Sequence, residues 1–410
     1  MPYIQRAITP ILKQRVSTSK CMLLVGARQV GKSTLIKHEF KDFNRANFDD
    51  RLTRMQAKEE PKLFLLNNPQ PLFIDEVQKE SSILEDIKQI VDESDERGMF
   101  LLSGSQKLEL MKGMSESLAG RVSISELTGL SMREIYGVKF NRHFIPTDAY
   151  IKEREKEIVK YDNIWEIIHK GSYPELYDID RDWQEYYSSY VATYLERDIN
   201  ELVAADGITF TKFLTAVAAR TGELLNYSNI AGDVGVSEPT IKNWISILER
   251  TGIVYLLQPY SASALKRAIK TPKLYFRDTG LACYLTRWLT AETLKCSAVA
   301  GNMFETFVVS EILKSYSNEG KDYRFNIFYY RGKDRNASGE NEIDLVIEED
   351  GVLYPVEIKM SGNPKADMGA TNQVLDKVSD KKRGLGVILC LIDKKTYLRE
   401  NLVALPIEFI

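Results

Sequence analysis

The sequence predicts a multidomain α/β protein with a helical section in its middle. Residues 1 to about 130 alternate short apolar runs with helical stretches. Residues 148–202 are helical, charged and aromatic, and strand patterns return after about residue 273. Strands that alternate with helices are typical of a parallel sheet with crossover helices. A length of 410 residues fits about two to four domains.

The composition excludes several classes of protein. Hydrophobic residues make up 44% and charged residues 28%, which is ordinary globular usage and excludes a disordered or fibrous chain. The net charge of −3 excludes a uniformly basic nucleic-acid coat. The four cysteines lie far apart without a C-x-x-C pair, so we expect neither a disulfide framework nor a zinc ribbon, and a cytoplasmic location. No apolar run approaches 18 residues, so we expect no membrane span.

A phosphate-binding loop follows the first predicted strand, Cys21–Val25. The segment Gly26–Ser33 reads GARQVGKS and matches G-x-x-x-x-G-K-[ST] at every fixed position. Glycine lets the loop turn its N–H groups toward phosphate oxygens, and the helix that follows presents its positive end. Lys32 is expected to reach the β- and γ-phosphates of ATP, and Ser33 to bind Mg²⁺. The predicted nucleotide contacts are Gly26, Ala27, Arg28, Gln29, Val30, Gly31, Lys32, Ser33 and Thr34.

Two later strands are expected to supply the remaining catalytic groups. The apolar run 71–74 ends in Asp75 and Glu76. We expect Asp75 to support Mg²⁺ and Glu76 to activate the attacking water as general base. The run 100–102 leads into Ser103 and Ser105, which either contact the γ-phosphate or form a simple turn. Arg121 is either an arginine finger, acting in cis or in trans, or a structural cation.

These motifs resemble the AAA-type P-loop ATPases of bacteria and archaea, whose loop reads G-[AP]-R-[RQ]-x-G-K-[ST]. The segments Ile74–Glu76, Leu102–Ser105 and Leu118–Arg121 share the likeness. The resemblance implies an AAA-type ATPase domain, which we place at residues 1–145, and it implies ATP binding and hydrolysis. The remainder resembles the C-terminal region of these ATPases through Tyr194–Asp198 and Phe276–Leu281.

The middle of the chain is predicted as a helical connector, residues 146–208, and a winged helix-turn-helix, residues 209–272. In the connector, tyrosines four residues apart indicate a core or interdomain face. In the winged helix, the third helix, Glu238–Arg250, carries balanced charge, so it is either a DNA-reading helix or a contact for another domain or protein. The stretch 259–277 combines five cations with aromatic residues, which favours either nucleic-acid binding or a solvated face.

The last section, residues 273–410, contains a hairpin with candidate metal ligands. Strands 342–348 and 352–359 carry Asp344, Glu357 and Lys359, and period-2 geometry puts the last two on one sheet face. Glu305, on the preceding helix, is a third carboxylate. The arrangement resembles the PD-(D/E)XK nucleases, although Ile343 replaces the proline of that motif. The resemblance implies a restriction-nuclease-like α/β domain. Whether its carboxylates hold Mg²⁺ for cleavage, or are surface charges or members of ion pairs, is left open.

Together these features predict a protein that hydrolyses ATP with Mg²⁺ and couples its nucleotide state to binding by the C-terminal half. Two alternatives are an ATP-regulated, metal-dependent DNA nuclease and a non-enzymatic nucleotide switch. The expected partners are therefore ATP and, among the open alternatives, DNA, other proteins or a second copy of the chain.

Overall fold

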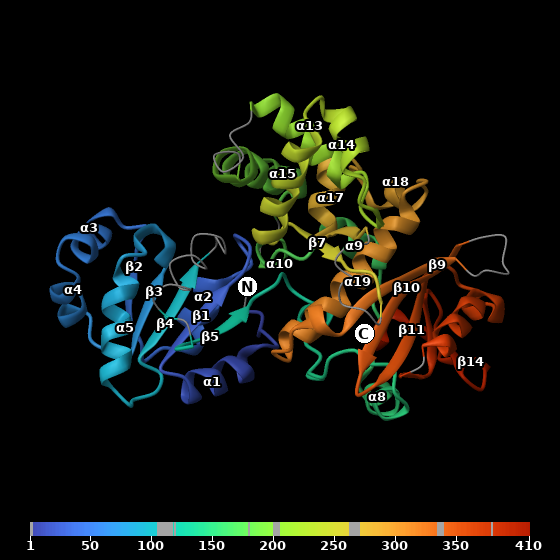
Figure 1. The fold of residues 1–410 in the computed structure, drawn as a ribbon, viewed down its shortest axis with the longest axis horizontal. Coiled ribbons are helices and arrows are strands. Elements are labelled where there is room, and N and C mark those ends of the chain that lie inside the picture. Colours follow the sequence, from blue (N-terminus) through green and yellow to red (C-terminus); the bar gives the residue numbers. More distant parts are fainter. Residues whose placement is uncertain are drawn as a thin grey trace.

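In the computed structural model, the protein has three lobes, one on each side of the view in Figure 1 and one above them. The structure describes residues 3–104, 118, 120–178, 181–199, 206–261, 271–333, 340–378 and 380–410. The predicted mixed α/β class is confirmed. Of the described helices, none has the length and apolar character that crossing a membrane needs.

The first lobe is a parallel five-stranded sheet with the order β2-β3-β4-β1-β5. Its core strands are short apolar runs that are buried along their full length, as expected for a sheet covered on both faces. The strands are β1 (Cys21–Val25), β2 (Asn44–Asn47), β3 (Leu72–Asp75), β4 (Phe100–Gly104) and β5 (Val122–Glu126). The helices around it are α1 (Thr9–Thr18), α2 (Lys32–Glu39), α3 (Arg51–Glu59), α4 (Pro61–Asn67) and α5 (Ile83–Glu93).

A helical cluster joins this lobe to the others. The stripe of tyrosines is buried as predicted, with Tyr186, Tyr190 and Tyr194 at most 2% exposed. The chain that carries them is an α-helix only as far as Tyr190 and continues as a π-helix, η3 (Val191–Ile199). The helices are α7 (Met132–Ile135), α8 (Asp148–Arg154), α9 (Ile164–Lys170), α10 (Glu175–Asp178), α11 (Trp183–Tyr190), α17 (Thr279–Leu285) and α18 (Ala291–Lys295).

The upper lobe combines three helices with a small antiparallel sheet of order β6-β8-β7. Strand β8 begins at residue 273, the first residue of the predicted C-terminal domain. It pairs with β7 and so belongs to the sheet of the upper lobe. The helices α17 and α18, which follow β8, pack against α9. The elements are α13 (Gly207–Ala218), β6 (Glu223–Leu224), α14 (Tyr227–Val234), α15 (Glu238–Arg250), β7 (Val254–Leu257) and β8 (Lys273–Phe276).

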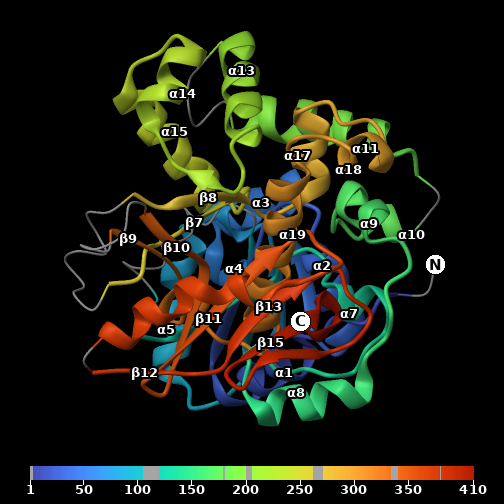
Figure 2. The same cartoon turned by 90° about the vertical axis from the view of Figure 1, so that its right-hand side faces the viewer.

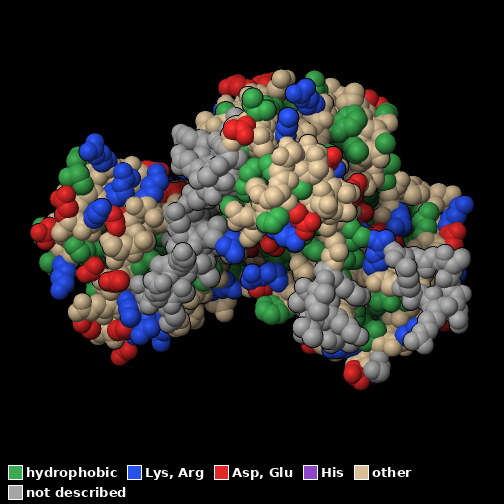
Figure 3. Space-filling view, turned by 45° about the horizontal axis from the view of Figure 1, so that its top comes forward, with side chains coloured by type: hydrophobic (Ala, Val, Ile, Leu, Met, Phe, Trp, Pro, Cys, Tyr) green, Lys and Arg blue, Asp and Glu red, His purple; other side chains and the backbone are tan. Residues whose placement is uncertain are grey.

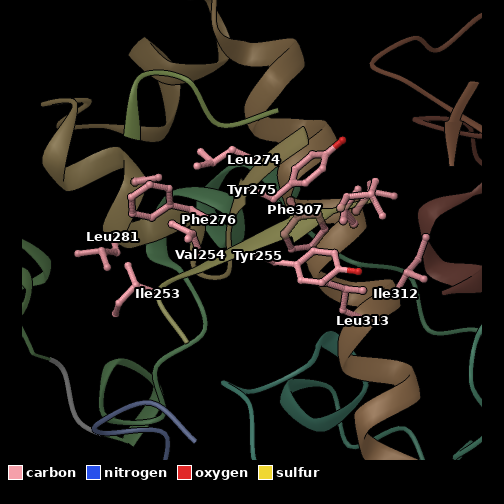
Figure 4. Close-up of a cluster of buried hydrophobic side chains, with 14 of the residues drawn as sticks. Ile253, Val254, Tyr255, Leu274, Tyr275, Phe276, Leu281, Phe307, Ile312 and Leu313 are labelled. Atoms are coloured by element: carbon pink, nitrogen blue, oxygen red, sulfur yellow. The ribbon is translucent and has the colours of Figure 1, made fainter. Parts of the chain in front are cut away.

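The third lobe is a mixed seven-stranded sheet in which β10 and β11 form the predicted hairpin. The long helix α19 (Ala300–Asn318) is buried along most of its length. Figure 4 shows its Phe307 and Leu313 close to Tyr255 of β7, so one hydrophobic core joins this helix to the upper lobe. The strands are β9 (Ile327–Lys333), β10 (Glu340–Glu349), β11 (Val352–Lys359), β12 (Lys382–Arg383), β13 (Gly386–Cys390), β14 (Thr396–Arg399) and β15 (Leu402–Pro406). Short 3₁₀ segments are η1 (Val77–Glu80), η2 (Glu155–Glu157), η4 (Tyr323–Phe325), η5 (Ala366–Lys377) and η6 (Ile407–Phe409).

Candidate nucleotide site and C-terminal charge cluster

The glycine-rich loop leaves β1 at the carboxyl edge of the parallel sheet. Strand β1 lies between β4 and β5, and ligands of open α/β sheets bind outside the carboxyl ends of strands where the strand order reverses. Gly26 is required by close approach, because a Cβ there would lie 2.3 Å from the carbonyl oxygen of Leu127. Gly31 has φ of 93°, in the left-handed region that favours glycine, and α2 begins directly after it.

Lys32 is buried in the loop, with 5% of its surface exposed. Its Nζ donates to the carbonyl oxygens of Gly26 and Ala27, both at 2.9 Å. Burial lowers the pKa of Lys32 to about 8, although the nearby Glu76 and Asp75 act in the opposite direction. The lysine therefore lies close to both predicted acids, and its ammonium is held by loop carbonyls.

Asp75 ends β3 and is almost fully buried, at 6% exposure. The hydroxyl of Ser103, on the neighbouring strand β4, donates to its Oδ1. Ser103 is itself fully buried, so the structure gives it Asp75 as partner, and a direct contact with nucleotide stays a prediction. Ser105 lies outside the described residues. The pair places an anionic oxygen set beside the loop, which suits a hard cation such as Mg²⁺.

Glu76 has a left-handed backbone, with φ of 54° and ψ of 44°. Non-glycine residues rarely adopt this region, and such strain is concentrated at functional sites. Gln29 in the loop is a second example, with φ of 62°. The Gln78 side chain donates to the Glu76 carboxylate.

A cleft of about 820 Å³ opens beside these groups. Its lining includes the loop and the start of α2. It also includes apolar side chains from three distant segments: Tyr3 and Ile4 near the N-terminus, Leu130 after β5, and Pro174 in the connector. Sequence reasoning missed these residues because nothing local marks them. Of the predicted contacts, the cleft is lined by Arg28, Gln29, Gly31, Lys32, Ser33, Thr34 and Glu76.

A cis role for Arg121 is wrong. Strands β1 and β5 are parallel, with Cys21 opposite Val122 and Val25 opposite Glu126. Arg121 precedes β5, so it lies at the amino edge of the sheet, whereas the loop lies at the carboxyl edge. Five strand residues, about 16 Å, separate the two edges. Arg121 forms an ion pair with Asp92. A role in trans stays a prediction.

The three predicted C-terminal carboxylates form ion pairs with two different lysines, Lys359 and Lys273. Lys359 Nζ lies 2.9 Å from Asp344 Oδ2 and 2.8 Å from Glu357 Oε2, so these two oxygens are at most about 6 Å apart. Glu305 instead accepts from Tyr275 (2.6 Å) and Lys273 (3.3 Å). Across the described ranges, no three His, Cys, Asp or Glu side chains form a group that could hold a metal. The structure therefore does not gather Glu305, Asp344 and Glu357 into one such group among these residues, and a role for Glu305 as a third metal ligand stays a prediction.

The carboxyl group of Glu357 lies in surroundings that disfavour its charged form. Burial, reinforced by the nearby Asp344 carboxylate, raises its pKa to about 8, although Lys359 opposes the shift. Its Oε1 is buried without a hydrogen-bond partner. Burial without full compensation costs free energy, so this oxygen has an open requirement for a proton or a cation.

The basic stretch 259–277 is not a solvent-facing binding surface at its described cations. Lys273 is buried and pairs with Glu305 and Glu342, and Arg277 pairs with Glu126 at the end of β5, 2.8 Å away. Lys273 therefore connects β8 to α19 and β10, and Arg277 connects the segment after β8 to β5. The other cations, Lys266, Arg267 and Lys270, lie outside the described residues. On the face in Figure 3, the described basic and acidic side chains are interspersed.

Comparison with known proteins finds family matches for three parts of the chain. Residues 18–136 match the family described as "AAA domain", which supports the P-loop ATPase resemblance of the motifs. Residues 161–292 match "Domain of unknown function (DUF8612)" and residues 300–410 match "Domain of unknown function (DUF4143)". Both descriptions leave the winged-helix and nuclease-like assignments as predictions.

Two relatives are the uncharacterized proteins Mb2031c of Mycobacterium bovis and Rv2008c of Mycobacterium tuberculosis. Each is 26% identical over 372 residues, which is 89% of this chain and 76% of the relative. Among solved structures, the Walker-type ATPase paby2304 of Pyrococcus abyssi matches with a TM-score of 0.43 at 14% identity, over 68% of this chain and 94% of its own. The ORC2 protein of Aeropyrum pernix in its ADP form matches with a TM-score of 0.32 at 15% identity, over 77% and 96%. These scores are too low to define a shared overall fold.

Proposed function

We propose that the protein binds and hydrolyses ATP with Mg²⁺ in the cleft at the carboxyl edge of β1, and that nucleotide state is transmitted to the C-terminal half. The observation that carries the proposal is the position of Lys32. It is buried between the loop carbonyls and the two acids that end β3. ATP phosphates entering the loop replace the carbonyls as acceptors for its ammonium.

Two neighbouring groups fit the metal that accompanies ATP. Ser33 follows Lys32 in the first turn of α2, and Asp75 is a buried carboxylate that accepts a hydrogen bond from Ser103. Together they would hold Mg²⁺, which neutralises charge on the phosphates when bound. The Ser103 hydrogen bond fixes the direction in which Asp75 presents its second oxygen.

Glu76 is the proposed general base. It lies one residue beyond Asp75 and lines the cleft, and its left-handed backbone turns the chain sharply at the end of β3. A carboxylate here can take a proton from the water that attacks the γ-phosphate. Gln78 orients the carboxylate through its amide.

The apolar part of the cleft lining is the proposed place for the adenine ring. Tyr3 is stacked on His38, with ring centroids 3.8 Å apart, and Ile4, Leu130 and Pro174 line the same cleft. Because Pro174 belongs to the connector, a bound nucleotide would contact the first lobe and the connector at once.

Three loop residues touch the rest of the protein directly. The Arg28 guanidinium lies over the ring of Tyr194 in η3. Pro174 approaches Gly31, and the turn at Gly252, which ends α15, approaches Ala27. A change in loop conformation on ATP binding would therefore alter the contacts of the loop with the connector and with the upper lobe. Helix α15 of that lobe is the proposed third helix of a winged helix-turn-helix.

The test is ATP turnover by the full chain with and without DNA, compared with Lys32→Ala. We expect Mg²⁺-dependent turnover in the wild type and loss of nucleotide binding in the variant. Turnover that DNA stimulates supports coupling to nucleic acid. Binding of ATP without turnover supports the alternative of a non-enzymatic switch with protein partners. Unchanged ATP affinity in Lys32→Ala would reject the site.

A second candidate, an ATP-regulated metal-dependent nuclease, is favoured by the convergence of Asp344, Glu357 and Lys359 on one face of the hairpin. Two carboxylates would hold Mg²⁺, and the lysine would position the attacking water. The unpartnered Oε1 of Glu357 fits the need for a cation. Nicking of plasmid DNA that requires Mg²⁺ or Mn²⁺ and is lost in Asp344→Ala, while ATP turnover persists, would support it. Lack of nicking under every nucleotide condition would exclude it.

A further inference from the structure

Arg6 lies in the short segment before α1 and is almost fully buried, at 3% exposure. Its guanidinium reaches three separate segments of the chain. One nitrogen donates to the carbonyl oxygen of Val30 in the phosphate loop at 2.8 Å. A second donates to Thr128 O at 2.7 Å and Gly129 O at 3.3 Å, just after β5. The Nε donates to Glu134 Oε1 at 3.0 Å.

Glu134 is fixed in turn. It accepts from the backbone N–H groups of Ala7 at 2.8 Å and Ser131 at 2.7 Å, and it closes a capping box at the start of α7. The Arg6 guanidinium therefore has little freedom to rotate. A charged donor held this firmly fixes the direction of each carbonyl that it binds.

The bond to Val30 bears on phosphate binding through the geometry of one peptide group. The peptide between Val30 and Gly31 is planar and trans, so its C=O and N–H point in opposite directions. Holding the Val30 carbonyl toward Arg6 turns the Gly31 N–H to the other side of the plane. Gly31 lines the cleft and directly precedes Lys32, so this N–H belongs to the part of the loop that receives the β-phosphate.

We infer that Arg6 is a positioning residue for nucleotide binding, which aims the Gly31 N–H at the β-phosphate by holding the Val30 carbonyl. The inference rests on the proposed nucleotide site and adds to it a residue that the loop motif does not contain. Arg6 also lines the cleft, but the role inferred for it is to position the loop and not to bind phosphate. Its effect falls on ligands that carry a β-phosphate.

The experiment compares ADP with AMP, which lacks the β-phosphate. Dissociation constants are measured on the full chain by competition with a fluorescent ADP analogue, for the wild type, Arg6→Met and Arg6→Lys. We expect Arg6→Met to weaken ADP on the order of tenfold or more and AMP by much less. Arg6→Lys keeps the charge and one donor, so it should be intermediate with a melting temperature near that of the wild type.

Arg15 offers a matched control. It too is an arginine that binds backbone carbonyls, those of Ile124 (2.8 Å) and Gly320 (2.6 Å), but none of them is in the loop. Arg15→Met should lower the melting temperature and leave the ratio of ADP to AMP affinity unchanged. If the Arg6 variants weaken ADP and AMP equally, or leave ADP unchanged, the positioning role is rejected. Failure of the wild type to bind either nucleotide would reject the proposed site itself.

Discussion

The Arg28 guanidinium lies over the ring of Tyr194, with its central carbon 5.2 Å from the ring centroid. One residue belongs to the phosphate loop and the other to the π-helix of the connector. Segments of π-helix are rare and are often found at functional sites. The contact links the loop motif to Tyr194–Asp198, a segment that had no assigned chemistry.

Replacing Tyr194 should weaken this link. We expect nucleotide binding to slow hydrogen exchange in residues 191–199 of the wild type and to do so much less in Tyr194→Leu, because a cation–π contact is worth about 0.5–2 kcal/mol. Tyr194→Phe keeps the ring and serves as the control. Equal protection in the leucine variant would mean that the signal does not pass through this ring.

Glu76→Gln should bind ATP and nearly stop hydrolysing it. The amide keeps the size of the side chain and loses the basicity, which costs about 10²–10⁴ in rate for a general base. Single-turnover kinetics with a separate binding measurement distinguish the two steps. Turnover near the wild-type rate would exclude Glu76 as the base.

ATP affinity should fall as pH rises above about 8. Burial lowers the pKa of Lys32 to about 8 in the nucleotide-free protein, and phosphates beside its ammonium raise that pKa again. Binding above pH 8 therefore takes up a proton, and the neutral lysine binds less tightly. Calorimetry at pH 8.5 in two buffers of different ionisation enthalpy measures the uptake. Lys32→Arg does not titrate in this range, so proton uptake of the same size in that variant would assign it to another group.

Glu357→Gln should stabilise the protein more at pH 8 than at pH 5. The pKa of Glu357 is raised to about 8 in the folded chain, above its ordinary value of 4.5, so the folded state holds a proton that the unfolded state releases. This carboxyl group therefore lowers the free energy of unfolding, and the loss becomes larger as the pH rises between these two pKa values. Thermal unfolding of both proteins across pH 5–8 provides the check. A difference in melting temperature that stays constant with pH would contradict the shift.

Asp344→Ala should leave ATP turnover intact and lower the affinity for Mn²⁺ if the hairpin binds a cation. Asp344 is the acceptor for both the Ile358 N–H (2.8 Å) and Lys359, so some loss of stability is also expected. Lys359→Met distinguishes the loss of metal affinity from the loss of stability, because it removes the lysine ammonium group and keeps both carboxylates. Stronger Mn²⁺ binding in Lys359→Met would show that the lysine and the metal compete for the same oxygens.

The local features could be predicted from the residues alone: the loop from Gly26 to Ser33, the strand that leads into Asp75 and Glu76, and the hairpin that carries Glu357 and Lys359. Each is encoded within a few consecutive residues, where spacing and alternation specify the backbone. Only the tertiary structure shows which partners these groups contact. Arg121 lies at the edge of the sheet away from the loop, Glu305 accepts hydrogen bonds from Lys273 and Tyr275, and Arg6 donates to the Val30 carbonyl. Such partners can lie far apart in the chain: Arg6 and Glu134 are separated by 128 residues, and Arg15 and Gly320 by 305. They are set by strand order and by packing between lobes, which no local pattern of residues records.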